Sequence, residues 1–262
     1  MRIFLTLLAV SAMLQPQRYS PVQDGDAHGD PPYVLEDGWE PLLNGKDLTG
    51  WKACDAGAKS EWYTTKFIRY ERLLGPTQLN GRAAPNGVML NGPTGRTANF
   101  CTERTFGDIE LYLEFMLAKG SNSGVYLQGL YEIQIFDSWG SIEGMKTSDA
   151  GAIYHQSIDD RGVGGSPPLV NAARRPGEWQ SYQVWFRAPR FDGAGKKIEP
   201  ARFQRVLLNG VMVQKDFAVD GPTRAHLAIA EAPQNPLMLQ GDHGPVAFRN
   251  IYVRSLRPLV LR

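Results

Sequence analysis

From residue 39 onward, apolar and polar residues alternate along much of the chain with a period of two, which is typical of half-buried β-strands. The clearest run is 109–117, where Ile, Leu and Phe occupy every second position and Glu, Tyr and Met fill the positions between them. One side of this strand is expected to seal a core, and the other to meet solvent or a second layer. The pattern predicts further strands at 88–90, 98–102, 124–128, 131–137, 182–188, 203–208 and 248–253.

Turn residues separate these strands. The sequence Leu208-Asn209-Gly210-Val211 predicts a tight hairpin, because Asn-Gly suits a type I′ turn. The 18 prolines and 28 glycines are scattered, and no amphipathic helical stretch of convincing length is found. Many short strands with turns between them indicate an all-β sandwich or barrel. The stretches 157–178 and 190–200 are predicted to be long surface loops, either functional or merely variable.

The start of the chain resembles a secretory signal. Residues 1–14 begin with Met1 and Arg2 and continue with an apolar run that is too short to span a bilayer comfortably. The alternative is a buried N-terminal strand or helix. Residues 15–35 are interpreted as a linker or disordered lead, and residues 36–262 as a single domain. We therefore expect a periplasmic or secreted protein, in which Cys54 and Cys101 are able, though not required, to pair.

Charge and composition narrow the range of partners. Lys and Arg number 28 against 27 Asp and Glu, and this balance argues against a nucleic-acid partner, which would require a basic face. Hydrophobic residues make up 42% of the chain, enough for a packed core. No stable membrane insertion is expected. A neutral ligand such as a glycan is compatible with all of these features.

The strand 131–137 carries the most informative polar residues. If its isoleucines face the core, Glu132 and Gln134 project together from the other face, roughly 6–7 Å apart. A carboxylate and an amide at that spacing can contact adjacent positions of one sugar ring. Asp137 would point inward in a regular pleat, so it joins them only through the strand end or a bulge. The alternative is an ordinary solvated strand face.

A second candidate is the turn that contains Asp242 and His243, just before the last predicted strand. A histidine beside a carboxylate can act as a general acid or base near neutral pH. Arg249 alternates with Phe248 along the strand and is a candidate donor to an anion or a hydroxyl. The alternative is a capped turn with a salt bridge at the strand end.

Aromatic side chains offer stacking surfaces for a sugar, and we select Tyr131, Trp139 and Tyr154 as candidates, although most buried aromatic residues simply form core. Metal binding is weakly indicated, since the four histidines are dispersed and form no HxH or HExxH pattern. A divalent cation could still be held if Glu132, Asp137 and His243 converge in space. No other cofactor is indicated.

An ordered series of motifs resembles one known family. The segment 39–51, WEPLLNGKDLTGW, resembles the opening signature of the 3-keto-disaccharide hydrolase domain family, long catalogued as a domain of unknown function. The resemblance continues in order through 121–126, 131–137, 151–154, 177–179, 208–211 and 239–251, and so covers about residues 38–257. It implies a concanavalin-like jelly roll of two antiparallel sheets, with a ligand groove on the concave face. It also implies exported bacterial proteins that cleave 3-keto-glycosides.

Five residues match the polar motifs of that family: Glu132, Gln134, Asp137, His243 and Arg249. One departure is Gly241, which separates Gln240 from Asp242 where the family pattern leads us to expect no spacer, and it should alter loop geometry more than chemistry.

The resemblance suggests a chemical hypothesis. A ketone at C3 of a sugar acidifies the C2 proton, so a base can remove it and the enolate can expel the C1 substituent. The base would be Glu132 or His243, and the acid Asp137 or His243. Arg249, Gln134 or a divalent cation would stabilise the enolate. The alternatives are direct two-carboxylate hydrolysis, a lectin-like module that binds glycans without chemistry, and a structural adhesion domain.

Overall fold

The computed structural model describes residues 31–142 and 144–258. These residues form one short helix, α1 (Pro32–Leu35), and nineteen strands: β1 (Glu40–Pro41), β2 (Trp51–Ala53), β3 (Tyr63–Thr65), β4 (Arg69–Glu71), β5 (Gly75–Asn80), β6 (Val88–Leu90), β7 (Phe100–Phe106), β8 (Ile109–Leu117), β9 (Asn122–Leu127), β10 (Tyr131–Phe136), β11 (Gln156–Ile158), β12 (Arg161–Val163), β13 (Gln180–Arg187), β14 (Arg190–Phe191), β15 (Lys197–Glu199), β16 (Ala201–Leu208), β17 (Val211–Val219), β18 (Asn235–Leu239) and β19 (Val246–Ser255).

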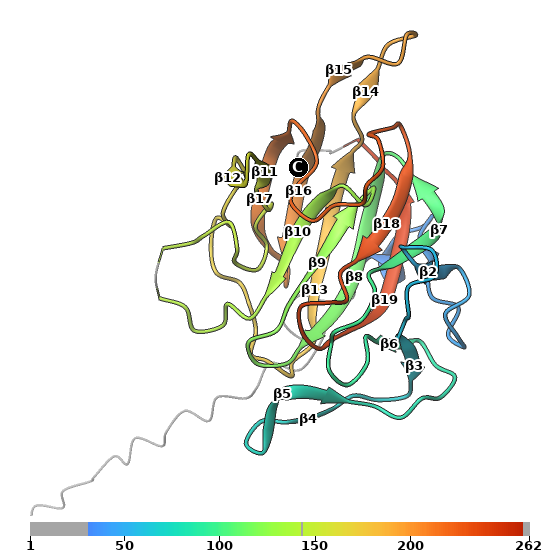
Figure 1. Cartoon of the computed structure of the whole chain (residues 1–262), viewed down its shortest axis with the longest axis vertical. Coiled ribbons are helices and arrows are strands. Elements are labelled where there is room, and N and C mark those ends of the chain that lie inside the picture. The colour runs from blue at the N-terminus through green and yellow to red at the C-terminus, as the bar shows by residue number, and fades with distance from the viewer. Residues whose placement is uncertain (1–30, 143, 259–262) are drawn as a thin grey trace, which may run out of the picture.

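Two antiparallel sheets lie face to face and enclose one core (Figure 1). The larger sheet has the order β17-β16-β13-β8-β19-β6-β3, with β1 pairing with β19 as its eighth strand. The smaller sheet has five strands in the order β10-β9-β18-β7-β2. This all-β jelly-roll sandwich confirms the predicted fold class. Neighbours in each sheet are often far apart in sequence, so both sheets are held together by long-range pairing.

Strand β8 begins and ends where the alternation predicted, but both of its faces are buried. Its Ile, Leu and Phe side chains enter the core between the sheets. The opposite face is covered by a second layer that includes Tyr33, whose ring stacks on Tyr252 at 3.9 Å. Tyr33 belongs to helix α1, which lies within the segment 15–35 that the sequence analysis interpreted as a linker or lead. Residues 1–30, which include the predicted signal, lie outside the described residues.

The turn predictions are confirmed at one position and corrected at two. Asn209 and Gly210 have positive φ values of 52° and 78° and connect β16 to β17, as a tight hairpin turn requires. Both predicted loops instead contain short hairpins, β11–β12 and β14–β15. These strands are only two or three residues long, so they carry no recognisable alternation.

The two cysteines form a disulfide between Cys54, just after β2, and Cys101 on β7, with their Cα atoms 5.0 Å apart. The disulfide joins two neighbouring strands at one side of the five-stranded sheet. Within the described residues, no helix is long and apolar enough to cross a membrane.

Candidate functional site

The five-stranded sheet carries a polar surface on the face that points away from the core. Ile133 of β10 packs in the core, so the alternation of the strand turns Glu132 and Gln134 to the outer face, as the sequence predicted. The register places Glu132 beside Tyr126 and Gln134 beside Gly124 on strand β9. Glu132 is nevertheless only 2% exposed and Gln134 only 3%. The strand face is therefore a covered site rather than a solvated surface.

A glycine makes room for the carboxylate. A Cβ atom added to Gly124 would lie 2.2 Å from Oε1 of Glu132, so the Glu132 side chain bends along the sheet and lies over Gly124. On its other side, Gly124 accepts a hydrogen bond from the backbone N–H of Gln240, at 3.0 Å. The carboxyl group therefore lies over strand β9, between Gln134 on one side and Gln240 on the other.

Burial controls the chemistry of this carboxyl group. The pKa of Glu132 is raised from 4.5 to about 8, chiefly because burial desolvates the carboxyl group; a hydrogen bond with Tyr126 opposes the shift, and the negative charge of Asp242 adds to it. The backbone oxygen of Arg224, 3.2 Å from the Tyr126 hydroxyl, is an alternative acceptor for the single proton of that hydroxyl. At neutral pH Glu132 is therefore largely protonated and able to donate a proton.

Three side-chain amides near this carboxyl group have oxygens without a hydrogen-bond partner. Within the described residues, six buried side-chain atoms lack a hydrogen-bond partner, and three of them are Asn122 Oδ1, Gln134 Oε1 and Gln240 Oε1. All three belong to the segments around Gly124, because Asn122 lies two residues before it on the same strand face. Buried amides rarely lack partners. Each can accept from a hydroxyl or, after a half-turn, donate to a carbonyl oxygen.

The predicted Asp242–His243 turn lies at the border of the same site. Nδ1 of His243 is 2.6 Å from Oδ1 of Asp242, and both side chains are about half exposed. The backbone oxygen of His243 accepts a hydrogen bond from the N–H of Asn122 at 3.2 Å, which fixes the turn to β9. Asp242 lies two residues after Gln240, whose N–H binds Gly124, and its negative charge contributes to the raised pKa of Glu132.

Two further segments enclose the other end of the site. Tyr154 follows Ile153, which bridges to Ile133 at the free edge of β10, and its backbone N–H donates to the oxygen of Glu132 at 3.1 Å. Thr223 is fully buried, and its hydroxyl accepts the N–H of Glu132 at 3.0 Å. Tyr154, which the sequence analysis selected as a sugar-binding residue, therefore lies beside Glu132 in the chain fold.

Comparison with known proteins identifies the family. Residues 38–254 match the model of the 3-keto-alpha-glucoside-1,2-lyase-like domain. The chain belongs to this family. Membership makes it a glycosyl-hydrolase-like, carbohydrate-active protein. No curated protein matches the chain at a significant level.

Solved structures of two bacterial proteins are similar to this domain. One protein of Parabacteroides distasonis, assigned as a glycosyl hydrolase, is 27% identical, with a TM-score of 0.60 over 84% of each chain. A second protein of that organism with the same assignment is 20% identical, with a TM-score of 0.51 over 84% of this chain and 94% of its own. The second likeness concerns the fold alone.

Three predicted site residues of the lyase-like domain lie away from Glu132. Asp137 accepts the backbone N–H of Gly120 at 2.9 Å and caps a turn, because it follows the strand end and faces away from the Glu132 side. Tyr131 is fully buried in the core between the sheets. Arg249 binds Glu114 on the outer face of the other sheet, with Nε to Oε2 at 2.5 Å. These positions correct the expectation of one site shared by all of them.

Trp139 lies near the end of strand β10 and is neither buried in the core nor shown beside Glu132. It lies three residues beyond the end of β10 and is 48% exposed, with the guanidinium of Arg175 4.8 Å from its ring centroid. Its role in substrate binding remains a prediction.

The three residues predicted to hold a divalent cation do not form one site. In the described part of this lyase-like domain, no group of three or more His, Cys, Asp or Glu side chains is arranged to hold a metal ion. Glu132, Asp137 and His243 therefore do not converge as the sequence hypothesis required. The reason is the strand geometry, which sends Asp137 to the far end of β10.

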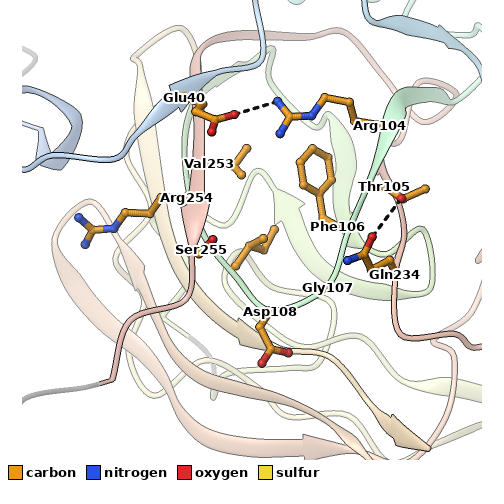
Figure 2. Close-up of a pocket in the computed structure, with 11 residues that line it drawn as sticks. Glu40, Arg104, Thr105, Phe106, Gly107, Asp108, Gln234, Val253, Arg254 and Ser255 are labelled. Carbon is orange, nitrogen blue, oxygen red and sulfur yellow. Dashed lines mark hydrogen bonds and ion pairs between the residues drawn. The ribbon is translucent and has the colours of Figure 1, made fainter.

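A second hollow of the lyase-like domain, of about 200 Å³, lies beside the ends of β7 and β19 (Figure 2). Its charged residues are already paired, since Arg104 binds Glu40 at 3.0 Å and Arg254 binds Glu110 at 2.5 Å. Figure 2 shows Asp108 and Arg254 pointing away from the hollow. It offers little to a ligand, and the Glu132 surface remains the candidate site.

Several residues of the site were missing from the predicted set: Asn122, Gly124, Tyr126 and Gln240. The signal for Asn122 and Gly124 was the alternation of β9, which places both on the face of Tyr126. Their importance depends on strand pairing, which alternation alone does not show.

Proposed function

We propose that this protein cleaves 3-keto-glycosides by removing the C2 proton, expelling the C1 substituent and then adding water. The observation that carries the proposal is a buried glutamic acid with a raised pKa, beside amides whose oxygens lack partners and bordered by an Asp–His pair. Family membership supports a carbohydrate substrate. The geometry supports an acid and a base in one site.

His243 is the proposed base. Asp242 accepts the Nδ1 proton at 2.6 Å, which leaves Nε2 free to accept a proton from C2 of the sugar. The electrons of the C2–H bond then form an enolate with the C3 ketone. Asp242 stabilises the imidazolium that results.

Glu132 is the proposed acid. Because its pKa is raised to about 8, it carries a proton at neutral pH and can deliver it to the departing C1 oxygen. The enolate collapses as the C1–O bond breaks, which gives a C1–C2 double bond conjugated with the ketone. Water then adds at C1, and the proton returned to C2 completes the free 3-keto sugar.

The amides of Gln134, Gln240 and Asn122 are proposed to bind the sugar. Turned one way they accept its hydroxyl groups, and turned the other way they donate to the developing O3 anion. An uncharged ligand rich in hydroxyl groups can satisfy the amide oxygens of Asn122, Gln134 and Gln240, which lack partners.

The test is an assay of the purified protein with 3-keto-glucosides and their unoxidised parents, with added divalent cations and with chelator. Release of the C1 substituent from the keto forms alone is expected. Deuterium at C2 should slow cleavage or exchange into solvent, and the elimination route is wrong if neither occurs. Saturable binding without any cleavage would instead support a lectin-like module.

Substitution of the acid gives the sharper result. Glu132→Gln keeps the size of the side chain but removes the proton, so kcat should fall by about 10²–10⁴-fold, with KM little changed. Glu103→Gln, an exposed carboxylate on strand β7 of the same sheet, is the matched control and should keep full activity. Equal activity of both variants would exclude Glu132 as the acid.

We also propose that the protein is exported to the periplasm or the medium. The Cys54–Cys101 disulfide supports this, because such bonds persist in oxidising compartments, as does the basic start and apolar run of residues 1–14. Mass spectrometry of protein recovered from cell fractions should find an oxidised cysteine pair and a shortened N-terminus outside the cytoplasm. Full-length reduced protein confined to the cytoplasm would contradict export.

A further inference from the structure

The β4–β5 hairpin ends in two exposed leucines. Leu73 and Leu74 form its tip and are 90% and 91% exposed, whereas most large apolar side chains of the domain are buried. The two strands pair only with each other and form a small sheet of their own. In Figure 1 this hairpin lies at one end of the molecule, apart from the two main sheets.

The stem of the hairpin is firmly attached, so the tip is held outward. Leu79 of β5 is fully buried, and Ile68 and Tyr70 pack in the same small cluster against the outer face of the eight-stranded sheet. The backbone N–H of Lys119 donates to the oxygen of Pro76 at 2.7 Å. The leucines therefore cannot turn inward without losing this packing.

The hairpin together with the residues that flank it carries an excess of positive charge. Residues 66–82 contain Lys66, Arg69, Arg72 and Arg82 against the single acid Glu71, a net charge of +3, although the whole chain carries only +1. Arg69 pairs with Glu71 at 2.6 Å and Arg72 lies 4.0 Å from Glu178, so the excess positive charge comes from Lys66 and Arg82. All four basic residues are exposed, so this end of the domain attracts a negatively charged surface.

An apolar tip on a basic stem fits a lipid surface better than a protein partner. A stable protein interface usually covers about 800 Å² on each side, and two leucines on a convex tip are far too small for that. A bilayer needs no shape complementarity. Leucine side chains can enter the headgroup boundary while Lys and Arg approach anionic headgroups.

We propose that the β4–β5 hairpin binds this protein peripherally to an anionic lipid bilayer, with Leu73 and Leu74 entering the interface. The proposal is independent of the chemistry at Glu132. It describes adsorption to the membrane surface and involves no spanning segment.

The experiment is co-sedimentation of the full protein with vesicles of phosphatidylcholine alone or mixed with phosphatidylglycerol. We expect binding to the mixed vesicles only, weakened by salt. Leu73→Ser with Leu74→Ser should weaken binding at least about tenfold, and Lys66→Gln with Arg82→Gln about fivefold for each charge. Cleavage of a soluble substrate should be unchanged in every variant.

The matched control is Ile198→Ser, which removes a side chain that is 59% exposed on the β14–β15 hairpin at the other end of the molecule. It should bind vesicles like the unchanged protein. Absence of binding to mixed vesicles, or equal binding by the double leucine variant, would overturn the proposal. Concentration-dependent dimers that the leucine substitutions abolish, without vesicle binding, would assign the tip to a second copy of the chain and also overturn it.

Discussion

At the scale of single residues, the site depends on the absence of a side chain at Gly124. Glu132 alone would be an ordinary carboxylate on a strand. It becomes a buried acid because Gly124, on the neighbouring strand, leaves space for it to lie along the sheet. Burial then raises its pKa to about 8. Two residues from different strands therefore determine one chemical property.

Gly124→Ala should disturb this arrangement directly. The new Cβ would lie 2.2 Å from Glu132 Oε1, so the carboxyl group must move. We expect kcat to fall at least about tenfold, since displacing a catalytic group by about 1 Å can cost more than that. Gly193→Ala is the control, because its Cβ would meet nothing within 4 Å. Unchanged kcat and an unchanged pH profile in the Gly124 variant would show that the position of the carboxyl group is unimportant.

The buried acid should also make stability depend on pH. The pKa of Glu132 is higher in the folded state, about 8, than its ordinary value of 4.5, so the folded protein holds a proton that the unfolded chain releases. Stability should therefore fall as the pH rises from about 4.5 to about 8.

Glu132→Gln removes this dependence. The variant should match the unchanged protein near pH 4.5 and be more stable at pH 8 and above, which denaturant unfolding at both pH values would measure. Glu103→Gln, whose carboxylate is exposed, should show no such trend. A Glu132→Gln variant that gains no stability toward pH 8 would mean that the carboxyl group is not buried as described.

At the scale of secondary-structure elements, a strand can present a correct pattern and still belong to a different face than expected. Strand β19 carries Arg249 opposite Glu114 of β8, in the eight-stranded sheet. The candidate site is on the five-stranded sheet. The alternation of β19 was read correctly, but Arg249 does not share a face with Glu132 as expected, because alternation does not identify which sheet a strand joins.

Arg249→Gln should accordingly affect stability more than catalysis. Loss of the ion pair leaves the Glu114 carboxylate, whose side chain is 11% exposed, without this cation. The expected loss is about 1–3 kcal/mol, with kcat unchanged. Arg202→Gln breaks the more exposed pair with Asp216 and should cost about 0–1 kcal/mol. A large loss of kcat in a stable Arg249 variant would return Arg249 to the site.

The disulfide acts at the same scale. Cys101 packs against Tyr126 and Met238 on the outer face of the five-stranded sheet, and the bond closes a loop of sequence separation 47. Replacing Cys54 and Cys101 with Ser should reduce stability by about 4 kcal/mol through the greater freedom of the unfolded chain. Denaturant unfolding of the double variant, compared with that of the oxidised parent protein, measures the effect. A double variant as stable as the oxidised protein would contradict it.

At the scale of the whole molecule, the sandwich brings distant segments to one surface. Asn122 to Gln134 and Gln240 to His243 are more than 100 residues apart in the chain, yet strand β18 pairs with β9 and continues into the Asp242–His243 turn. The eight-stranded sheet supports this arrangement from behind by sharing its core. The hairpin of residues 69–80 adds a separate surface at one end (Figure 1).

The sequence by itself determined the strands whose side chains alternate, the Asn-Gly hairpin and the position of Glu132 and Gln134 on one face, whereas the two-sheet jelly roll was predicted only from the family resemblance. The first three features arise from local periodicity and turn chemistry, which a short window of residues contains. Only the tertiary structure decided that Cys54 pairs with Cys101, that Tyr131 is core, and that Asp137 and Arg249 lie away from Glu132. Strand order, burial and the space above Gly124 result from contacts between segments far apart in the chain, and no local pattern records them.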